Sequence, residues 1–192
     1  MFPTTIWTTI REAGANDAEA LERFARDYRG PVLRFVAGRG FEGGDAEDLC
    51  QDVFLRILNG GVLARADAAR GRFRSLLLSV VKHAIADRLR RRGETPEADL
   101  EPADRDPDFD REWVLELSER ALLRLREEGS PYYQVLREHL EGRPQDRNKL
   151  WIARRKLRAF LRHEVALTCS SPAELEGELA YLSGFLRPEE KP

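Results

Sequence analysis

Apolar residues recur along this chain at spacings of three and four, the period of an amphipathic α-helix. No sustained alternation of apolar and polar residues bounded by turn residues, which is typical of β-strands, competes with that period. The pattern therefore predicts an all-α protein. In the first half we expect helices from about Asp17 to just before Gly30, from Pro31 to Gly38, from Asp45 to Leu58, and from Phe73 to Arg91.

Helix breakers and caps set the ends of these predicted helices. Gly30-Pro31 should separate the first two, because a residue before proline is biased away from helical geometry and proline suits the first turn of a helix. Asp45 is an N-cap candidate, with Asp48 three residues later as in a capping box. Gly93 is expected to close the helical first half.

The second half of the chain continues the helical pattern. Two amphipathic helices are predicted near residues 113–125 and 132–140. A strongly basic helix should run from about Asn148 to Thr168, and Ser171-Pro172 should start a short last helix.

An acidic segment separates the two halves. Residues 94–110 hold three prolines and eight acidic residues against one arginine, a net charge of -7, which is the composition of a flexible, self-repelling linker. We therefore expect two small helical domains, residues 1–93 and 111–192, joined by this acidic linker.

Charge is segregated along the chain, although the formal net charge is only -2. Residues 70–92 hold eight basic residues against one acid, and residues 147–163 hold seven basic residues and no acid. Such blocks suit the phosphates of a nucleic acid, and the alternative is a pair of solvated basic helix faces.

The sequence offers little for catalysis. Cys50 and Cys169 stand alone, without the spacing of a disulfide framework or a zinc site. We find no phosphate-binding glycine loop, metal-ligand cluster or activated nucleophile, so the prediction is no catalytic residue, metal, cofactor or small-molecule substrate, and no enzyme. The lack of a signal-peptide pattern and of any apolar run near the ~18 residues of a membrane span predicts a cytoplasmic protein.

Two stretches carry the functional pattern. Residues 45–58, DAEDLCQDVFLRIL, place acidic and amide side chains opposite an apolar face. Residues 70–92, RGRFRSLLLSVVKHAIADRLRRR, place bases at both ends of one helix and an aromatic at its start, which suits phosphate contacts and stacking on an unpaired base. Each stretch taken alone is also compatible with a solvated helix face.

Together, these stretches resemble region two of the extracytoplasmic-function group of the sigma-70 family of RNA polymerase sigma factors. Residues 63–77 are particularly similar to a divergent subgroup of these factors. Residues 2–7 resemble the N-terminal start of that subgroup, and residues 160–166 and 171–182 resemble its C-terminal end. The resemblance implies a protein that binds core RNA polymerase and promoter DNA, with an anti-sigma factor as a further candidate partner.

The resemblance also assigns roles to single residues. The surface for the polymerase clamp helices would comprise Asp45, Glu47, Asp48, Gln51, Asp52 and Arg56. Contacts with the promoter minus-ten element, where bases leave the duplex, would come from Arg72, Phe73, Arg74, Ser75, Lys82, His83, Asp87, Arg88 and Arg91. Many members of the group carry tryptophan three residues after the phenylalanine, whereas this chain has Leu76, so base capture is expected to rest more on Phe73.

The second half resembles a shortened region four. Residues 148–162 look like a recognition helix, and the candidate phosphate contacts there are Arg147, Lys149, Arg154, Arg155 and Arg158. The few residues between Leu140 and Lys149 leave no room for the scaffold helix of a helix-turn-helix. The alternative is an amphipathic helix that packs on its predecessor with its bases solvated.

Two functions follow from this interpretation. The first is a sigma factor that binds core polymerase and directs promoter recognition and DNA melting in transcription initiation. The second, motivated by the shortened region four, is a non-catalytic regulatory module that binds polymerase or a sigma partner without productive promoter recognition. A further hypothesis is that the acidic linker shields a basic domain from DNA, the alternative being a solubilising spacer.

Overall fold

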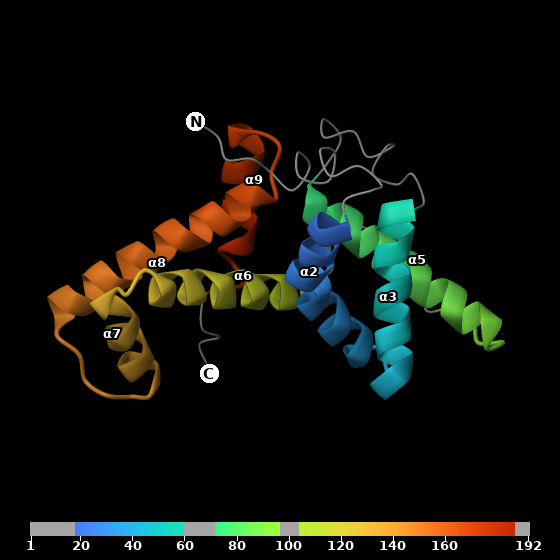
Figure 1. Ribbon diagram of the computed structural model, residues 1–192, viewed down its shortest axis with the longest axis horizontal. Coiled ribbons are helices and arrows are strands. Elements are labelled where there is room, and N and C mark those ends of the chain that lie inside the picture. Colours follow the sequence, from blue (N-terminus) through green and yellow to red (C-terminus); the bar gives the residue numbers. More distant parts are fainter. Residues whose placement is uncertain (1–17, 60–71, 97–103, 187–192) are drawn as a thin grey trace.

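The computed structural model describes residues 18–59, 72–96 and 104–186 of the chain. All regular structure in these ranges is helical, which confirms the all-α prediction. The helices are α2 (Ala18–Gly38), α3 (Gly43–Asn59), α5 (Phe73–Arg91), α6 (Pro107–Glu127), α7 (Pro131–Leu140), α8 (Arg147–Leu167) and α9 (Pro172–Leu182) (Figure 1). The resembling segments at 2–7 and 63–71 lie outside the described residues. None of the described helices combines the length and apolar character that crossing a membrane requires.

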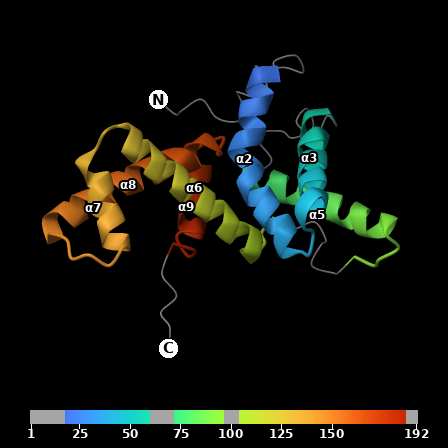
Figure 2. The same ribbon diagram turned by 60° about the horizontal axis from the view of Figure 1, so that its bottom comes forward.

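The helices gather at two ends of the molecule, and α6 runs between them. Helices α2, α3 and α5 lie at one end, and α7 lies at the other beside the N-terminal part of α8 (Figure 1, Figure 2). The first half of α6 packs in the apolar cluster of α2, α3 and α5, and its second half packs with α7 and α8. The two predicted domains therefore contact each other through α6, and their division at residues 94–110 stays a prediction.

Helix α2 passes through Pro31 without a break, so the two helices expected around Gly30-Pro31 are one. Proline has no N–H, so the carbonyl of Asp27, four residues earlier, loses its usual helical partner. The guanidinium of Arg120 on α6 donates to that carbonyl oxygen and lies 4.6 Å from the ring centroid of Tyr28. A contact from another helix thus replaces the hydrogen bond that proline removes.

Gly30 lets α6 come close to α2 at the same place. A Cβ atom added there would collide with Glu116 Oε2, whereas one added at Gly38 would meet nothing within 4 Å. Beside it, Arg34 Nε donates to Glu112 at 2.6 Å, and Arg34 Nη2 donates to Glu116 at 3.2 Å. Gly30 therefore leaves room for the end of the Glu116 side chain between α6 and α2, beside these ion pairs.

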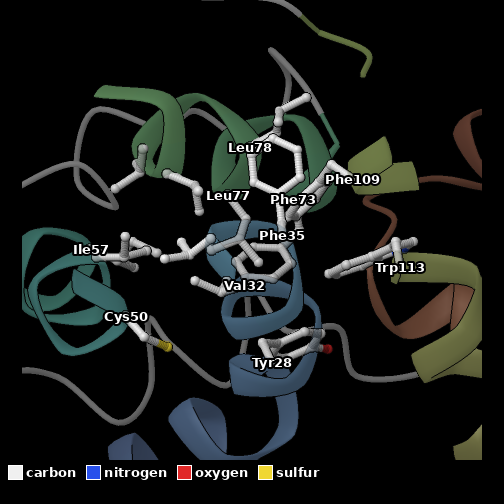
Figure 3. Close-up of a cluster of buried hydrophobic side chains, with 14 of the residues drawn as sticks. Tyr28, Val32, Phe35, Cys50, Ile57, Phe73, Leu77, Leu78, Phe109 and Trp113 are labelled. Atoms are coloured by element: carbon white, nitrogen blue, oxygen red, sulfur yellow. The ribbon is translucent and has the colours of Figure 1, made fainter. Parts of the chain in front are cut away.

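One apolar cluster joins the first three helices to α6. Its aromatic centre is formed by Tyr28 of α2, Phe73 of α5 and Trp113 of α6, all buried, with Ile57 of α3 to one side (Figure 3). Trp113 stacks on Tyr28 with ring centroids 5.5 Å apart, and Phe73 meets Tyr28 edge-on at 4.9 Å. Because burying a large apolar side chain stabilises a fold by about 1.5–3 kcal/mol, α6 is an integral part of this core.

Two helix starts differ from the prediction. Helix α3 begins at Gly43, so Asp45 lies in the first turn and is not the N-cap. Helix α6 begins at Pro107, inside the expected linker, because Asp106 caps it by accepting from the Asp108 N–H at 3.1 Å. Aspartate at the N-cap with proline next is a strong start signal, and in the sequence it coincides with the acidic composition typical of a linker.

The remaining helix ends agree with the sequence. Helix α5 has its predicted bounds and is followed by Gly93 at a φ of +78°. Ser171 caps α9 by accepting from the Glu174 N–H at 3.2 Å. Asp146 caps α8 by accepting from the Lys149 N–H at 2.8 Å.

A smaller apolar cluster holds the outer end of the molecule together. Its buried members are Leu125 of α6, Leu136 of α7 and Ala153 of α8. Residues 141–146 connect α7 to α8, with Gly142 at a φ of +80°, where glycine is favoured. Helix α7, the helix predicted near residues 132–140, therefore packs on α8, as the structural alternative for the basic helix expects.

Replacing Arg120 with alanine should lower the free energy of unfolding by about 2–3 kcal/mol. The change strands the Asp27 carbonyl and removes a guanidinium that lies 3.8 Å from the buried Glu164 carboxylate. Denaturant unfolding followed by circular dichroism measures the loss. Arg126→Ala, at an exposed position of the same helix, is the matched control and should cost less than about 0.5 kcal/mol. Equal losses in the two variants would contradict the role given to Arg120.

Candidate functional site

The predicted polymerase-binding residues lie on one side of α3, opposite its buried apolar side. The exposed members are Glu47, Asp48 and Gln51, and the half-buried members are Asp45, Asp52 and Arg56. Leu55 lies one turn beyond Gln51 and is 47% exposed. This side of the helix thus combines acids, an amide and an apolar spot that the sequence analysis did not single out.

Ion pairs tie part of this surface to the end of α5. Asp45 pairs with Arg92 and, at 3.4 Å, with Arg88. Arg56 Nη1 donates to Asp87 at 2.8 Å, and this hydrogen bond lowers the pKa of Asp87 below its usual range. Asp45 and Arg56, which are predicted to bind polymerase, therefore form ion pairs with Arg88 and Asp87, which are predicted to bind DNA.

Asp48 and Gln51 are the members most accessible to a partner. Glu47 is paired with Arg29 of α2, and Asp52 lies 2.9 Å from Arg56. For Asp48 and Gln51 we find no such pairing within the described ranges, and both are exposed. A partner that binds this face would meet these two side chains without breaking an ion pair of the fold.

The predicted DNA contacts at the start of α5 are buried under the second half of the chain. Phe73 and Arg74 are 0% exposed, and Lys82 is 3% exposed. Arg72 is half-buried, with its Nε 3.0 Å from Glu178 of α9. In this arrangement Phe73 offers no ring face to a base, and Arg74 and Lys82 cannot reach a phosphate.

Arg74 is held by two buried carboxylates from the second half. Its Nε donates to Glu178 of α9 at 2.6 Å, and its Nη1 donates to Asp110 of α6. The Tyr181 hydroxyl donates to the other oxygen of Asp110. Burial raises the pKa of Asp110 above its usual range, although Arg74 favours the charged form. Burial and the bond to Asp110 raise the pKa of Tyr181 to about 12.

Lys82 is held by the residue that caps α6. Its Nζ lies 2.9 Å from Asp106 Oδ2, which Arg39 Nη2 approaches at 3.4 Å. Burial by itself raises the pKa of Asp106, but the bonds from Lys82 and from the Asp108 N–H, with the charge of Arg39, hold it below its usual range. The carboxylate is therefore ionised at neutral pH and balances the ammonium.

The other predicted contacts on α5 reach the surface to different degrees. His83 and Arg91 are exposed. Ser75 is half-buried and donates its hydroxyl to a backbone carbonyl just before α6 at 3.0 Å. Asp87 and Arg88 are half-buried in the ion pairs with α3.

Helix α8 presents a basic stripe to solvent. Side chains three, four and seven residues apart share one side of a helix, and the exposed ones here are Arg147, Trp151, Arg154, Arg155, Arg158 and Arg162. Lys149 is exposed too, but it lies two residues from Arg147 and Trp151 and therefore on another side of the helix. Trp151 is 57% exposed in the middle of the stripe, with the Arg155 guanidinium 5.6 Å from its ring centroid. The sequence analysis names the basic residues and misses Trp151. Its spacing of four residues from Arg147 and three from Arg154 could have placed it on the same side of the helix.

The titratable side chains of the described residues do not gather into a metal site, and both thiols are buried. In the described parts of the chain, no three His, Cys, Asp or Glu side chains come together as metal ligands would. Cys50 and Cys169 are buried, and burial raises the pKa of their thiols to about 11 and about 12. The described surface instead offers an acidic face on α3 and a basic stripe on α8.

Comparison with known proteins places the first half of the chain in a family. Residues 24–95, from within α2 to just beyond α5, match the Sigma-70 region 2 family. The chain is similar to the probable RNA polymerase sigma-C factor of Mycobacterium bovis and to the ECF RNA polymerase sigma factor SigC of Mycobacterium tuberculosis. Identity to each is 37% over 78 residues, which cover 41% of this chain and 40% of the relative. No solved structure matches the chain significantly.

Replacing Asp106 with asparagine should lower the free energy of unfolding at pH 7 by about 3 kcal/mol, because the buried Lys82 ammonium loses its carboxylate. The folded pKa of Asp106 is lowered, so the stability from this pair is present at neutral pH and is lost as the pH falls through that value. The difference between wild type and variant should shrink on going from pH 7 to about pH 3.

Denaturant titrations at the two pH values measure both effects. Asp104→Asn, at an exposed position in the same segment, is the matched control and should behave as wild type. A difference between wild type and Asp106→Asn that is the same at both pH values would show that the ion pair is not its cause.

Proposed function

We propose that this chain, which belongs to the sigma-70 family through its region 2 domain at residues 24–95, binds core RNA polymerase. On the same premise, it directs promoter recognition and DNA melting and does not itself catalyse a reaction. The carrying observation is that one helical unit holds both an exposed acidic face on α3 and a helix with a basic end, α5. Since the match spans 40% of each relative's length, the activity of the whole chain is part of the proposal.

Polymerase binding is assigned to the exposed side of α3. Asp48 and Gln51 supply charge and hydrogen-bonding groups, and Leu55 supplies apolar area between turns of polar residues. Interfaces commonly combine a small apolar centre with a polar rim, and this face has both. The surrounding ion pairs from Asp45 and Arg56 to α5 keep the face rigid without using its two accessible side chains.

DNA binding is assigned to two basic surfaces. His83 and Arg91 on α5 and the stripe on α8 are exposed and can meet phosphates as the molecule stands. Engagement of an unpaired base by Phe73, with Arg74 and Lys82 at the backbone, requires α6 and α9 to leave α5 first. Promoter melting is therefore proposed for a state in which the two halves have separated.

The regulatory alternative remains the second candidate function. It rests on the short connection between α7 and α8, and α8 packs on α7 through the smaller apolar cluster, as the structural alternative for α8 expects. The exposed Trp151 inside the basic stripe is the observation that favours a ligand for α8. Permanganate footprinting of a promoter complex separates the alternatives, since only the sigma factor forms an opened bubble.

Asp48→Ala combined with Gln51→Ala should weaken binding to core RNA polymerase by about tenfold, in line with the loss of an interface hot spot. Pull-down with core enzyme followed by run-off transcription measures binding and activity together. Glu119→Ala combined with Glu127→Ala removes two exposed acids of α6 and is the control, with binding as in wild type. Wild-type protein that fails to bind core polymerase would refute the proposed function.

Arg158→Gln should weaken binding to duplex DNA of any sequence and reduce the slope of log affinity against log salt by about 0.9, the share of one phosphate contact. Fluorescence anisotropy across a salt series measures the slope. Arg126→Gln, an exposed arginine of α6, should leave the slope unchanged. The same slope for wild type and Arg158→Gln would mean that this stripe does not meet phosphate.

A further inference from the structure

We propose that His139 of α7 is a positioning residue for the basic stripe of α8, because its imidazole holds the guanidinium of Arg154 in place for a DNA phosphate. The inference rests on the proposed function, in which the stripe meets DNA. It adds to that site a helix, α7, that carries none of the candidate DNA contacts. Helix α7 then contributes to DNA affinity through a side chain that it sets against the stripe.

The contact between the two side chains fixes which ring nitrogen carries the proton. Arg154 Nη2 lies 2.9 Å from His139 Nε2. A guanidinium has N–H donors and no acceptor, so Arg154 donates and Nε2 accepts. The ring is therefore the neutral tautomer with its hydrogen on Nδ1, and the contact leaves the positive charge of Arg154 in place.

Other arginines near Arg154 are held in a different way. Arg162, at the C-terminal end of the same stripe, pairs with Glu176, and Arg143, just before α8, pairs with Glu141. Arg154 has no carboxylate at ion-pair distance among the residues that the structure describes. A carboxylate orders a guanidinium and also neutralises it, whereas a neutral imidazole orders it and leaves its charge for an incoming anion.

The packing of α7 on α8 brings the imidazole to the stripe. Helix α7 lies beside the N-terminal part of α8 (Figure 1), and Leu136 and Ala153 are buried where the two helices meet. His139 lies one turn beyond Leu136, and Arg154 follows Ala153, so both lie at the edge of this buried contact. His139 is half-buried and Arg154 is exposed. The apolar contact thus sets the distance between imidazole and guanidinium, and the guanidinium remains open to solvent.

The neighbouring arginine of the stripe also has an uncharged partner. The guanidinium of Arg155 lies 5.6 Å from the ring centroid of Trp151, within the range of a cation–π contact. Two adjacent arginines are thus ordered by side chains that do not cancel their charge. Binding normally loses free energy when it immobilises long side chains, so arginines that are ordered in advance bind a phosphate more tightly.

The experiment measures the affinity of full-length variants for a labelled duplex oligonucleotide by fluorescence anisotropy at fixed salt. His139→Leu removes the acceptor and should weaken binding about two- to tenfold, the effect of immobilising one long side chain on binding. His139→Gln places an amide oxygen near the position of Nε2 and should restore most of the affinity. His163→Leu, at an exposed histidine of α8 outside the stripe, is the matched control and should bind as wild type.

A double-mutant cycle separates positioning from a general effect on the fold. Arg154→Gln should weaken binding, and adding His139→Leu to it should cause no further loss, because no guanidinium is left to hold. Circular dichroism and thermal unfolding check that each variant is folded. The inference is overturned if the loss from His139→Leu persists in the Arg154→Gln background. Wild-type affinity in either single variant overturns it as well.

Core-polymerase binding of the wild-type protein is measured in parallel, so that the two proposals can fail separately. Coupling between His139 and Arg154 without polymerase binding refutes the proposed function and leaves the positioning role standing. Polymerase binding without that coupling removes the positioning role alone. A wild-type protein that binds no duplex DNA overturns the inference and removes α8 from the proposed DNA site.

Discussion

The burial of Arg74 is the constraint on which the arrangement of the two halves depends. A guanidinium that is 0% exposed must be balanced by carboxylates, because an uncompensated buried charge costs several kcal/mol. Its partners, Asp110 on α6 and Glu178 on α9, both come from the far side of the acidic segment. Arg74 therefore joins both α6 and α9 to α5, and Tyr181 completes the network by donating a hydrogen bond to Asp110.

Helix α6 can serve both ends of the molecule because α2 is shaped to receive it. Gly30 leaves room for the end of the Glu116 side chain, and Pro31 leaves the Asp27 carbonyl for Arg120 to bind. A dipeptide that disfavours helix formation locally is thus accommodated by a tertiary contact. The aromatic stack of Trp113 on Tyr28 then makes the start of α6 part of the region 2 core.

The ion pairs around α5 connect the proposed polymerase and promoter functions physically. Arg56 pairs with Asp87, and Asp45 pairs with Arg88, so ion pairs join the acidic face of α3 to the basic end of α5. Arg74 near the start of α5 pairs with α6 and α9, and Lys82 at its middle pairs with the cap of α6.

The sequence by itself determined the helices, the all-α class and the resemblance, since period, caps and charge blocks are local. It predicted the bounds of α5 and the Ser171 cap of α9, and it identified the basic stripe of α8. Only the tertiary structure decided that α2 continues through Pro31, that Asp106 and Asp110 are ion-pair partners, and that Phe73 is buried. Each of these depends on contacts between residues tens of positions apart. A local sequence pattern shows which charges a segment carries, but it does not show which residues pair with those charges in the folded protein.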